Sequence, residues 1–116
     1  MTVNIDILYT KIGTKDNDDK LDCLYPIYLV YPNLPRYNLN HNPDYVYSNI
    51  LKHFKPVKTF KAGDLILFKF KNKYHFGIYT KNNIFCHFLS KGNLRLTNIN
   101  KYKKYINGVY RQWLQQ

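Results

Sequence analysis

The 116-residue sequence contains few of the features on which several classes of protein depend. It has two cysteines, Cys23 and Cys86, and its N-terminus has no apolar core between a basic start and a cleavage site. We therefore expect no signal peptide, and free thiols in place of a structural disulfide. No apolar run is long enough to span a membrane, and no internal repeat is present. The length predicts a single domain over residues 1–116.

Arginine is scarce as well, although the chain is strongly basic. Arg36, Arg95 and Arg111 are the only arginines among 18 basic residues, and 7 acidic residues leave a net charge of +11. Such a charge favours polyanionic surroundings, namely nucleic acid, a wall that carries teichoic acid, or anionic lipid. Guanidinium groups are the usual readers of bases, so their scarcity argues against a nucleic-acid partner. A coding bias toward lysine is the alternative source of the charge.

Aromatic and aliphatic residues are abundant enough to build a core, since 45% of the chain is hydrophobic and twelve residues are tyrosine. The first half, to about residue 60, has the pattern of helices and irregular chain. Helical spacing recurs at Leu24, Ile27, Tyr28 and Tyr31. A second helix is predicted from about Asp44 to Phe54, just after Pro43, with an apolar stripe formed by Val46, Ile50 and Phe54.

The second half, from residue 63 to residue 113, changes to the alternating pattern of strands. Runs rich in β-branched and aromatic residues cover 65–70, 74–80, 84–89, 94–99 and 105–113. The turns between them are short, and short turns join antiparallel neighbours because a parallel pair needs a long crossover. The sequence therefore predicts an α+β fold, with N-terminal helices packed on a C-terminal antiparallel β-sheet of five to six strands.

Two histidines occupy neighbouring predicted strands. Alternation puts His75 on one face of its strand with Gly77, and puts His87 on a face with Phe85. Antiparallel pairing of these strands would bring His75 and His87 close together. Cys86 points to the face opposite His87, which fits a core residue better than a nucleophile.

Cys23 has a setting of its own, because Pro26 follows three residues later. Proline is tolerated in the first turn of a helix, so Pro26 predicts that Cys23 is the N-cap of a helix. The helix dipole and free N–H groups would favour a thiolate there and could hold an oxyanion. Cys23, His75 and His87 can supply a nucleophile, a base and an orienting group. A zinc site from the two cysteines and two histidines matches no compact zinc spacing, so we expect no metal and no cofactor.

Several segments, in order, resemble the NlpC-type cell-wall cysteine peptidases. "DCLYPIYLVYPNLPRY" resembles their nucleophile segment, and Gly63, Asp64 and Leu65 resemble the turn into their first sheet strand. "YHFGIYTKNNIFCHFL" is similar to their His-x-Gly-Ile-Tyr strand and the hairpin that follows it. The resemblance covers roughly residues 21–112.

This resemblance implies a papain-like NlpC-type fold and hydrolysis of amide bonds in peptidoglycan stem peptides. Carried over to this chain, it makes Cys23 the nucleophile, His75 the general base and His87 the residue that orients His75. The chain is most similar to the tail-associated branch of lambda-like phages, the tail assembly protein K domain. That branch implies other phage tail proteins as partners, and a location in the virion or, before assembly, in the host cytoplasm.

One departure from the family's pattern leaves two further functions open. Leu24 and Tyr25 follow the cysteine where the family usually has the small pair Ser-Gly. An inactive member that serves as a structural or wall-binding part of a virion tail is therefore the alternative hypothesis. A nucleic-acid binder, suggested by the charge and by aromatic strands that could stack on bases, ranks below both because no known motif supports it.

Overall fold

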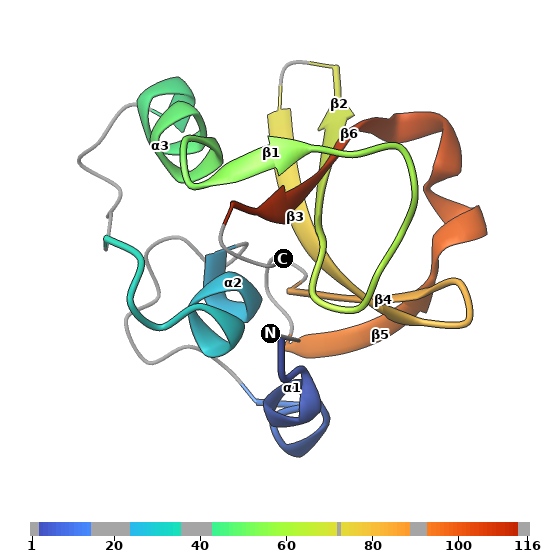
Figure 1. Cartoon of the computed structure of the whole chain (residues 1–116). Helices are drawn as coiled ribbons and strands as arrows, with labels where there is room; N and C mark the ends of the chain where they lie inside the picture. The colour runs from blue at the N-terminus through green and yellow to red at the C-terminus, as the bar shows by residue number, and fades with distance from the viewer. Residues whose placement is uncertain (1–2, 15–23, 36–42, 72, 89–92, 114–116) are drawn as a thin grey trace.

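A computed structural model describes residues 3–14, 24–35, 43–71, 73–88 and 93–113. Three short helices precede a sheet, as Figure 1 shows. The helices are α1 (Asp6–Thr10), α2 (Tyr25–Val30) and α3 (Pro43–Leu51). The strands are β1 (Phe54–Pro56), β2 (Leu65–Phe70), β3 (Lys73–Lys81), β4 (Ile84–Phe88), β5 (Leu94–Asn98) and β6 (Ile106–Gln112). The 3-10 turns η2 (Ile99–Lys101) and η3 (Lys103–Tyr105) join β5 to β6.

The six strands form one sheet in the order β1-β6-β2-β3-β4-β5, and all of its neighbours are antiparallel. Strands β2 to β5 follow one another as a meander, and β6 returns to pair with the other side of β2. The predicted α+β layout and the antiparallel sheet of five to six strands are therefore confirmed. No helix in the described ranges is long and apolar enough to cross a membrane.

The sheet separates two hydrophobic clusters, because alternate side chains of each strand point to opposite faces. On one face the helices pack against the sheet, with Leu24 and Ile27 of α2 beside side chains that include Phe76, Ile78 and Cys86. On the other face η2, η3 and the residue between them cover a cluster built around Ile66, Phe68, Phe85 and Ile99. Figure 1 shows the helices and the β5–β6 connection on opposite sides of the sheet.

The start of α2 and the end of α3 differ from their predicted positions. Helix α2 begins at Tyr25 with Leu24 at its N-cap, one residue later than the predicted cap at Cys23, and the Leu24 side chain is fully buried in the core. Pro26 lies in the first turn, as expected. Phe54 is not helical: it begins β1 opposite Gln112, and its ring packs edge-on against Tyr31 at 5.2 Å. Cys23 and Leu89 lie outside the described residues.

A buried ion pair fixes the place where the chain enters β2. The Asp64 side chain is fully buried, and its two carboxylate oxygens accept hydrogen bonds from Nε and Nη2 of Arg111 in β6, at 2.9 and 2.8 Å. The backbone N–H of Lys61 donates to the same carboxylate at 2.7 Å. The pKa of Arg111 is raised by its hydrogen bond to Asp64. A buried charge is tolerated only when it is paired and hydrogen-bonded, as this one is.

Arg111→Ala would leave the Asp64 carboxylate buried without its guanidinium partner. We expect this change to lower the free energy of unfolding by about 3 kcal/mol, the scale seen when one half of a buried pair is removed. Urea denaturation of the wild type and the variant measures this loss. Arg95→Ala is the matched control, since Arg95 is exposed on β5 and its loss should cost under about 0.5 kcal/mol. Equal losses in the two variants would contradict this account of Asp64.

Candidate active site

His75 of β3 and His87 of β4 contact each other through their ring nitrogens. Nε2 of His75 lies 2.9 Å from Nδ1 of His87, and the two rings meet at an interplanar angle of 77°. The strand register explains the contact: Ile78 pairs with Cys86, so His75 and His87 are diagonal neighbours on one face. The structure thus brings together the two histidines that the sequence predicted to be close.

A third side chain, Thr97 of β5, is hydrogen-bonded to the other ring nitrogen of His87. Nε2 of His87 lies 2.8 Å from Oγ1 of Thr97. In the tautomer in which Nε2–H of His87 donates a hydrogen bond to Thr97, Nδ1 of His87 is unprotonated and accepts a hydrogen bond from Nε2–H of His75, which leaves a lone pair on Nδ1 of His75. No side chain in the described part of the chain is hydrogen-bonded to that Nδ1 atom. The arrangement therefore presents His75 as a base with one nitrogen anchored and the other available.

Aromatic side chains pack around the two histidines, of which His87 is buried and His75 partly buried. The ring of Phe68 lies 6.0 Å from His75, and the rings of Phe85 and Tyr102 lie 4.5 and 5.7 Å from His87. Burial lowers the pKa of His75 to about 4. Burial lowers the pKa of His87 to about 3, with further contributions from the charges of His75 and Arg95. Both imidazoles are therefore neutral near pH 7.

Gly77, between the two histidines, is needed for the packing of this face. A Cβ atom at Gly77 would lie 2.6 Å from a ring carbon of Phe85, closer than non-bonded carbons approach. The Phe85 ring therefore lies across bare backbone at this position. The His-x-Gly pattern thus reflects the close packing of an aromatic ring beside the histidine pair.

The N-terminal end of α2 lies at the same end of the sheet as His75. The ring of Tyr25 packs edge-on against Phe88 at 5.8 Å, and its hydroxyl is hydrogen-bonded to Oγ1 of Thr14 at 2.9 Å. Extending the β3–β4 register places Phe88 opposite Phe76, one residue from His75. The histidines project from the opposite face, so a group from the start of α2 would reach them around the end of β4.

Cys86, the second thiol, is fully buried in the helix-side cluster. Burial raises the pKa of Cys86 to about 12, so its thiol is neutral and inert near pH 7. Its face is opposite to that of His87, as the alternation predicted. Among the described residues no three His, Cys, Asp or Glu side chains form a group that could hold a metal ion.

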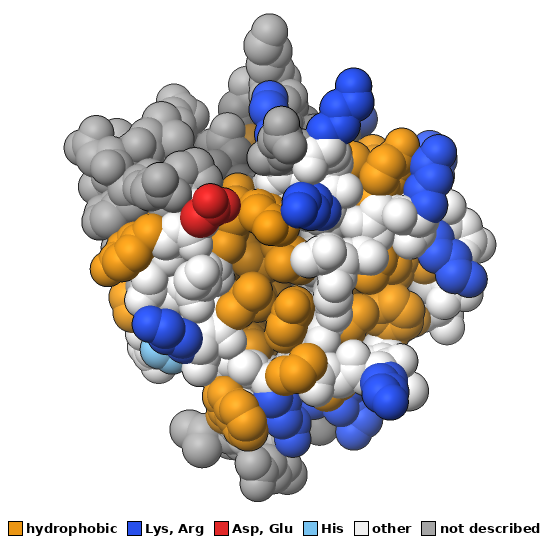
Figure 2. Space-filling model, turned by 90° about the horizontal axis from the view of Figure 1, so that it is seen from above, with side chains coloured by type: hydrophobic (Ala, Val, Ile, Leu, Met, Phe, Trp, Pro, Cys, Tyr) orange, Lys and Arg blue, Asp and Glu red, His pale blue; other side chains and the backbone are white. Residues whose placement is uncertain are grey.

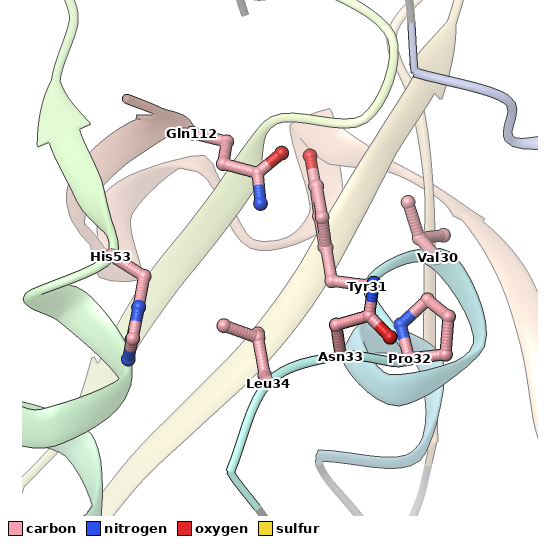
Figure 3. A pocket seen from close by; sticks show the side chains of 7 residues that line it. All are labelled: Val30, Tyr31, Pro32, Asn33, Leu34, His53 and Gln112. Atoms are coloured by element: carbon pink, nitrogen blue, oxygen red, sulfur yellow. The ribbon is translucent and has the colours of Figure 1, made fainter. Parts of the chain in front are cut away.

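A pocket of about 320 Å³ lies elsewhere, between the C-terminal end of α2 and the start of β1. Figure 3 shows Tyr31, Leu34, His53 and Gln112 around it. Neither His75 nor His87 lines this pocket. His53 is thus separate from the histidine pair.

The chain matches the NlpC/P60 family over residues 9–112. It belongs to the NlpC/P60 family. No curated protein shows significant similarity to it. NlpC/P60 proteins are typically cysteine peptidases or amidases that act on peptidoglycan, and the match extends over the histidine pair and over the segment that contains Cys23.

The histidine pair should make the fold sensitive to acid. Both imidazoles have a pKa below the ordinary value of 6.5 in the folded protein. The unfolded chain therefore binds more protons between about pH 6.5 and pH 3, and stability present above pH 6.5 is lost as the pH falls. We expect the urea midpoint to drop between pH 7 and pH 5.

The control for this prediction compares substitutions of the histidine pair with a substitution of the exposed His53. A variant with His75→Gln and His87→Gln should show a flatter pH dependence, whereas His53→Gln should keep the wild-type slope because His53 is exposed. A slope that is unchanged in the double variant would contradict the assignment of the acid sensitivity to this pair.

Thr97→Val should allow His87 to adopt either neutral tautomer, because valine has no hydroxyl to accept a hydrogen bond from Nε2. Long-range proton–nitrogen NMR spectra of the wild type are expected to show both imidazoles protonated at Nε2. The valine variant should show a mixture of tautomers, while Thr97→Ser should preserve the wild-type pattern. Protonation of Nδ1 of His75 in the wild type would refute the proposed direction of the hydrogen bonds.

Proposed function

We propose that this NlpC/P60 protein is a peptidoglycan-cleaving cysteine endopeptidase, with Cys23 as nucleophile, His75 as general base and His87 as the residue that orients His75. The observation that carries the proposal is the contact between His75 Nε2 and His87 Nδ1, which leaves Nδ1 of His75 open. A nucleophilic cysteine needs such a base, and the base needs a third group that holds it. A papain-like arrangement, with the cysteine at the start of α2, is part of the proposal.

The reaction would proceed through an acyl-enzyme. Nδ1 of His75 accepts the proton of the Cys23 thiol while the sulfur forms a bond to the carbonyl carbon of the stem peptide. The tetrahedral intermediate then breaks the carbon–nitrogen bond, and the departing amine takes the proton from His75. A water molecule, deprotonated by His75, next attacks the thioester. The second tetrahedral intermediate then breaks the carbon–sulfur bond and releases the new carboxylic acid, and the departing sulfur takes the proton back from His75 to restore the thiol.

The neutral state of His75 supports its role as the base. Burial lowers the pKa of His75, so at neutral pH the imidazole is unprotonated and its Nδ1 can accept a hydrogen bond from the thiol. The contact with His87 fixes the ring plane, and Thr97 in turn holds His87. The aromatic surroundings also lower the local polarity, which strengthens electrostatic interactions at the site.

The residues after the cysteine bear on the alternative, an inactive structural or wall-binding protein. Leu24 is fully buried in the helix-side cluster, and the ring of Tyr25 packs on Phe88 while its hydroxyl bonds Thr14. Both side chains therefore lie on the helix side of the sheet, away from the face of His75 and His87. This placement favours an active enzyme over one whose histidines are covered by Leu24 or Tyr25.

We further propose that the chain works as part of a phage tail, together with other tail proteins. The support is the similarity of its segments to the tail-associated branch of the family. Mass spectrometry of purified virions tests this location. The chain is expected among the tail proteins, and its absence from intact particles would refute the proposal.

Cys23→Ala and His75→Ala should each abolish the release of stem-peptide fragments from purified peptidoglycan. Loss of either the nucleophile or its base removes the covalent step, so we expect at least a thousandfold lower rate, the scale of such losses in nucleophilic enzymes. The released fragments are measured by liquid chromatography and mass spectrometry.

Cys86→Ala is the matched control for the thiol and His53→Gln for the imidazole. Both should retain the wild-type rate, because Cys86 is buried in the core and His53 is exposed away from the pair. Equal product release by the wild type and Cys23→Ala, or release by neither, would overturn the proposed activity.

A further inference from the structure

A second pocket, the tyrosine pocket, lies between α3 and the sheet and has a volume of about 360 Å³. That volume is at the lower end of the range for small-ligand sites. Its lining includes Tyr47, Ser48, Leu67, Tyr74, Asn107 and Tyr110. Three aromatic rings, one aliphatic side chain and two small polar groups thus share one concave surface.

Tyr47 and Tyr74 form a rigid corner of the pocket. Their ring centroids are 5.1 Å apart, and the ring planes meet at 72°. The hydroxyl of Tyr47 donates a hydrogen bond to the backbone carbonyl of Tyr74 at 3.1 Å, which joins α3 to β3. The two rings therefore keep their relative orientation without a ligand, and a rigid pair loses little entropy on binding.

Tyr110 is placed on the opposite side of the pocket by a glycine. A Cβ atom at Gly108 would lie 2.6 to 2.9 Å from the end of the Tyr110 side chain, so this ring lies across bare backbone. Gly108 pairs with Leu67 of β2, whose side chain lines the same pocket. Any residue larger than glycine at position 108 would push the Tyr110 ring away from this position.

The charges that line the pocket disfavour an anionic ligand. No lysine or arginine lines it, although the chain has 18 basic residues, so an anion would find no direct partner. Nζ of Lys69 lies 5.5 Å from the centroid of the Tyr74 ring and already supplies a cation to it. Asp44 contributes one carboxylate to the lining. Figure 2 looks onto the end of the molecule that carries α3 and shows hydrophobic side chains, tyrosine included, in the middle with Lys and Arg around them.

We infer that the tyrosine pocket binds a neutral saccharide unit of the wall glycan. A sugar ring has apolar C–H faces, which suit the electron-rich faces of tyrosine rings, and polar edges that Ser48 and Asn107 can bond. The inference rests on the proposed function, because glycan strands carry the stem peptides of peptidoglycan. Tyr74 and His75 are neighbours in β3 but point to opposite faces, so a bound sugar would lie on the helix side of the sheet, apart from the proposed base.

An NMR titration of the full chain with the trimer of N-acetylglucosamine tests this inference. We expect amide shifts centred on residues 47–51, 74 and 107–110. Asn107→Ala should weaken binding about three- to tenfold, the value of one hydrogen bond, and Gly108→Ala should weaken it by displacing the Tyr110 ring. Asn100→Ala is the matched control, since Asn100 is exposed in η2 away from the pocket.

The titration requires no turnover, so Cys23→Ala protein should bind the trimer as the wild type does even though it cleaves nothing. Loss of cleavage with binding intact would therefore be assigned to the catalytic residues alone. Absence of shifts at millimolar trimer, shifts centred outside the pocket, or stronger binding of tetramethylammonium than of the trimer would each overturn the saccharide assignment. An unchanged affinity in Asn107→Ala and Gly108→Ala would overturn it as well.

Discussion

The ion pair between Asp64 and Arg111 holds together the part of the sheet on which the candidate site is built. Asp64 stands at the entrance to β2, and its backbone carbonyl accepts a hydrogen bond from Tyr79 at 2.8 Å. The preceding Gly63, with a φ of +91°, donates to the carbonyl of Tyr79 and accepts from the hydroxyl of Tyr31 at 2.6 Å. These contacts join β2, β3, β6 and the end of α2 at one point. The β2–β3 register that begins there carries His75 to its place opposite Phe68.

With this register, the two faces of the sheet have different environments, one around the histidines and one against the helices. The face of His75 and His87 is lined by aromatic rings, and burial keeps both imidazoles neutral. The other face is packed by the helices, which bury Leu24 and Cys86. The two sides approach each other at the end of β4, where Tyr25 packs on Phe88. A nucleophile placed before α2 would therefore meet a base that is already desolvated and oriented.

Local pattern was enough to predict most of the sheet and the meeting of His75 with His87. Alternation and short turns determine which side chains share a face, and these are properties of neighbouring residues. The Asp64–Arg111 pair escaped prediction because its partners are 47 residues apart and meet only when β6 returns beside β2. Helix α1 and strand β1 were not predicted, since five and three residues are too few to show a period.

Thr97 was missed for a related reason. Threonine is common in strands, and its position beside His87 follows only from the β4–β5 register, in which Phe85 pairs with Thr97. Phe54 was assigned to a helix because its spacing from Val46 and Ile50 fits a helical stripe. It reaches the same core from a strand, where pairing with Gln112 satisfies its backbone. Periodicity thus identified a buried residue correctly while assigning it to the wrong element.

The central claim is that Cys23 and His75 form one catalytic site at the end of β4. The most direct test is the separation between Sγ of Cys23 and Nδ1 of His75 in a crystal structure of the protein. The account predicts a hydrogen-bonding separation, within about 4 Å, with Nε2 of His75 still on His87. A Cys23 sulfur buried on the helix side of the sheet, with the sheet between it and His75, would contradict the claim.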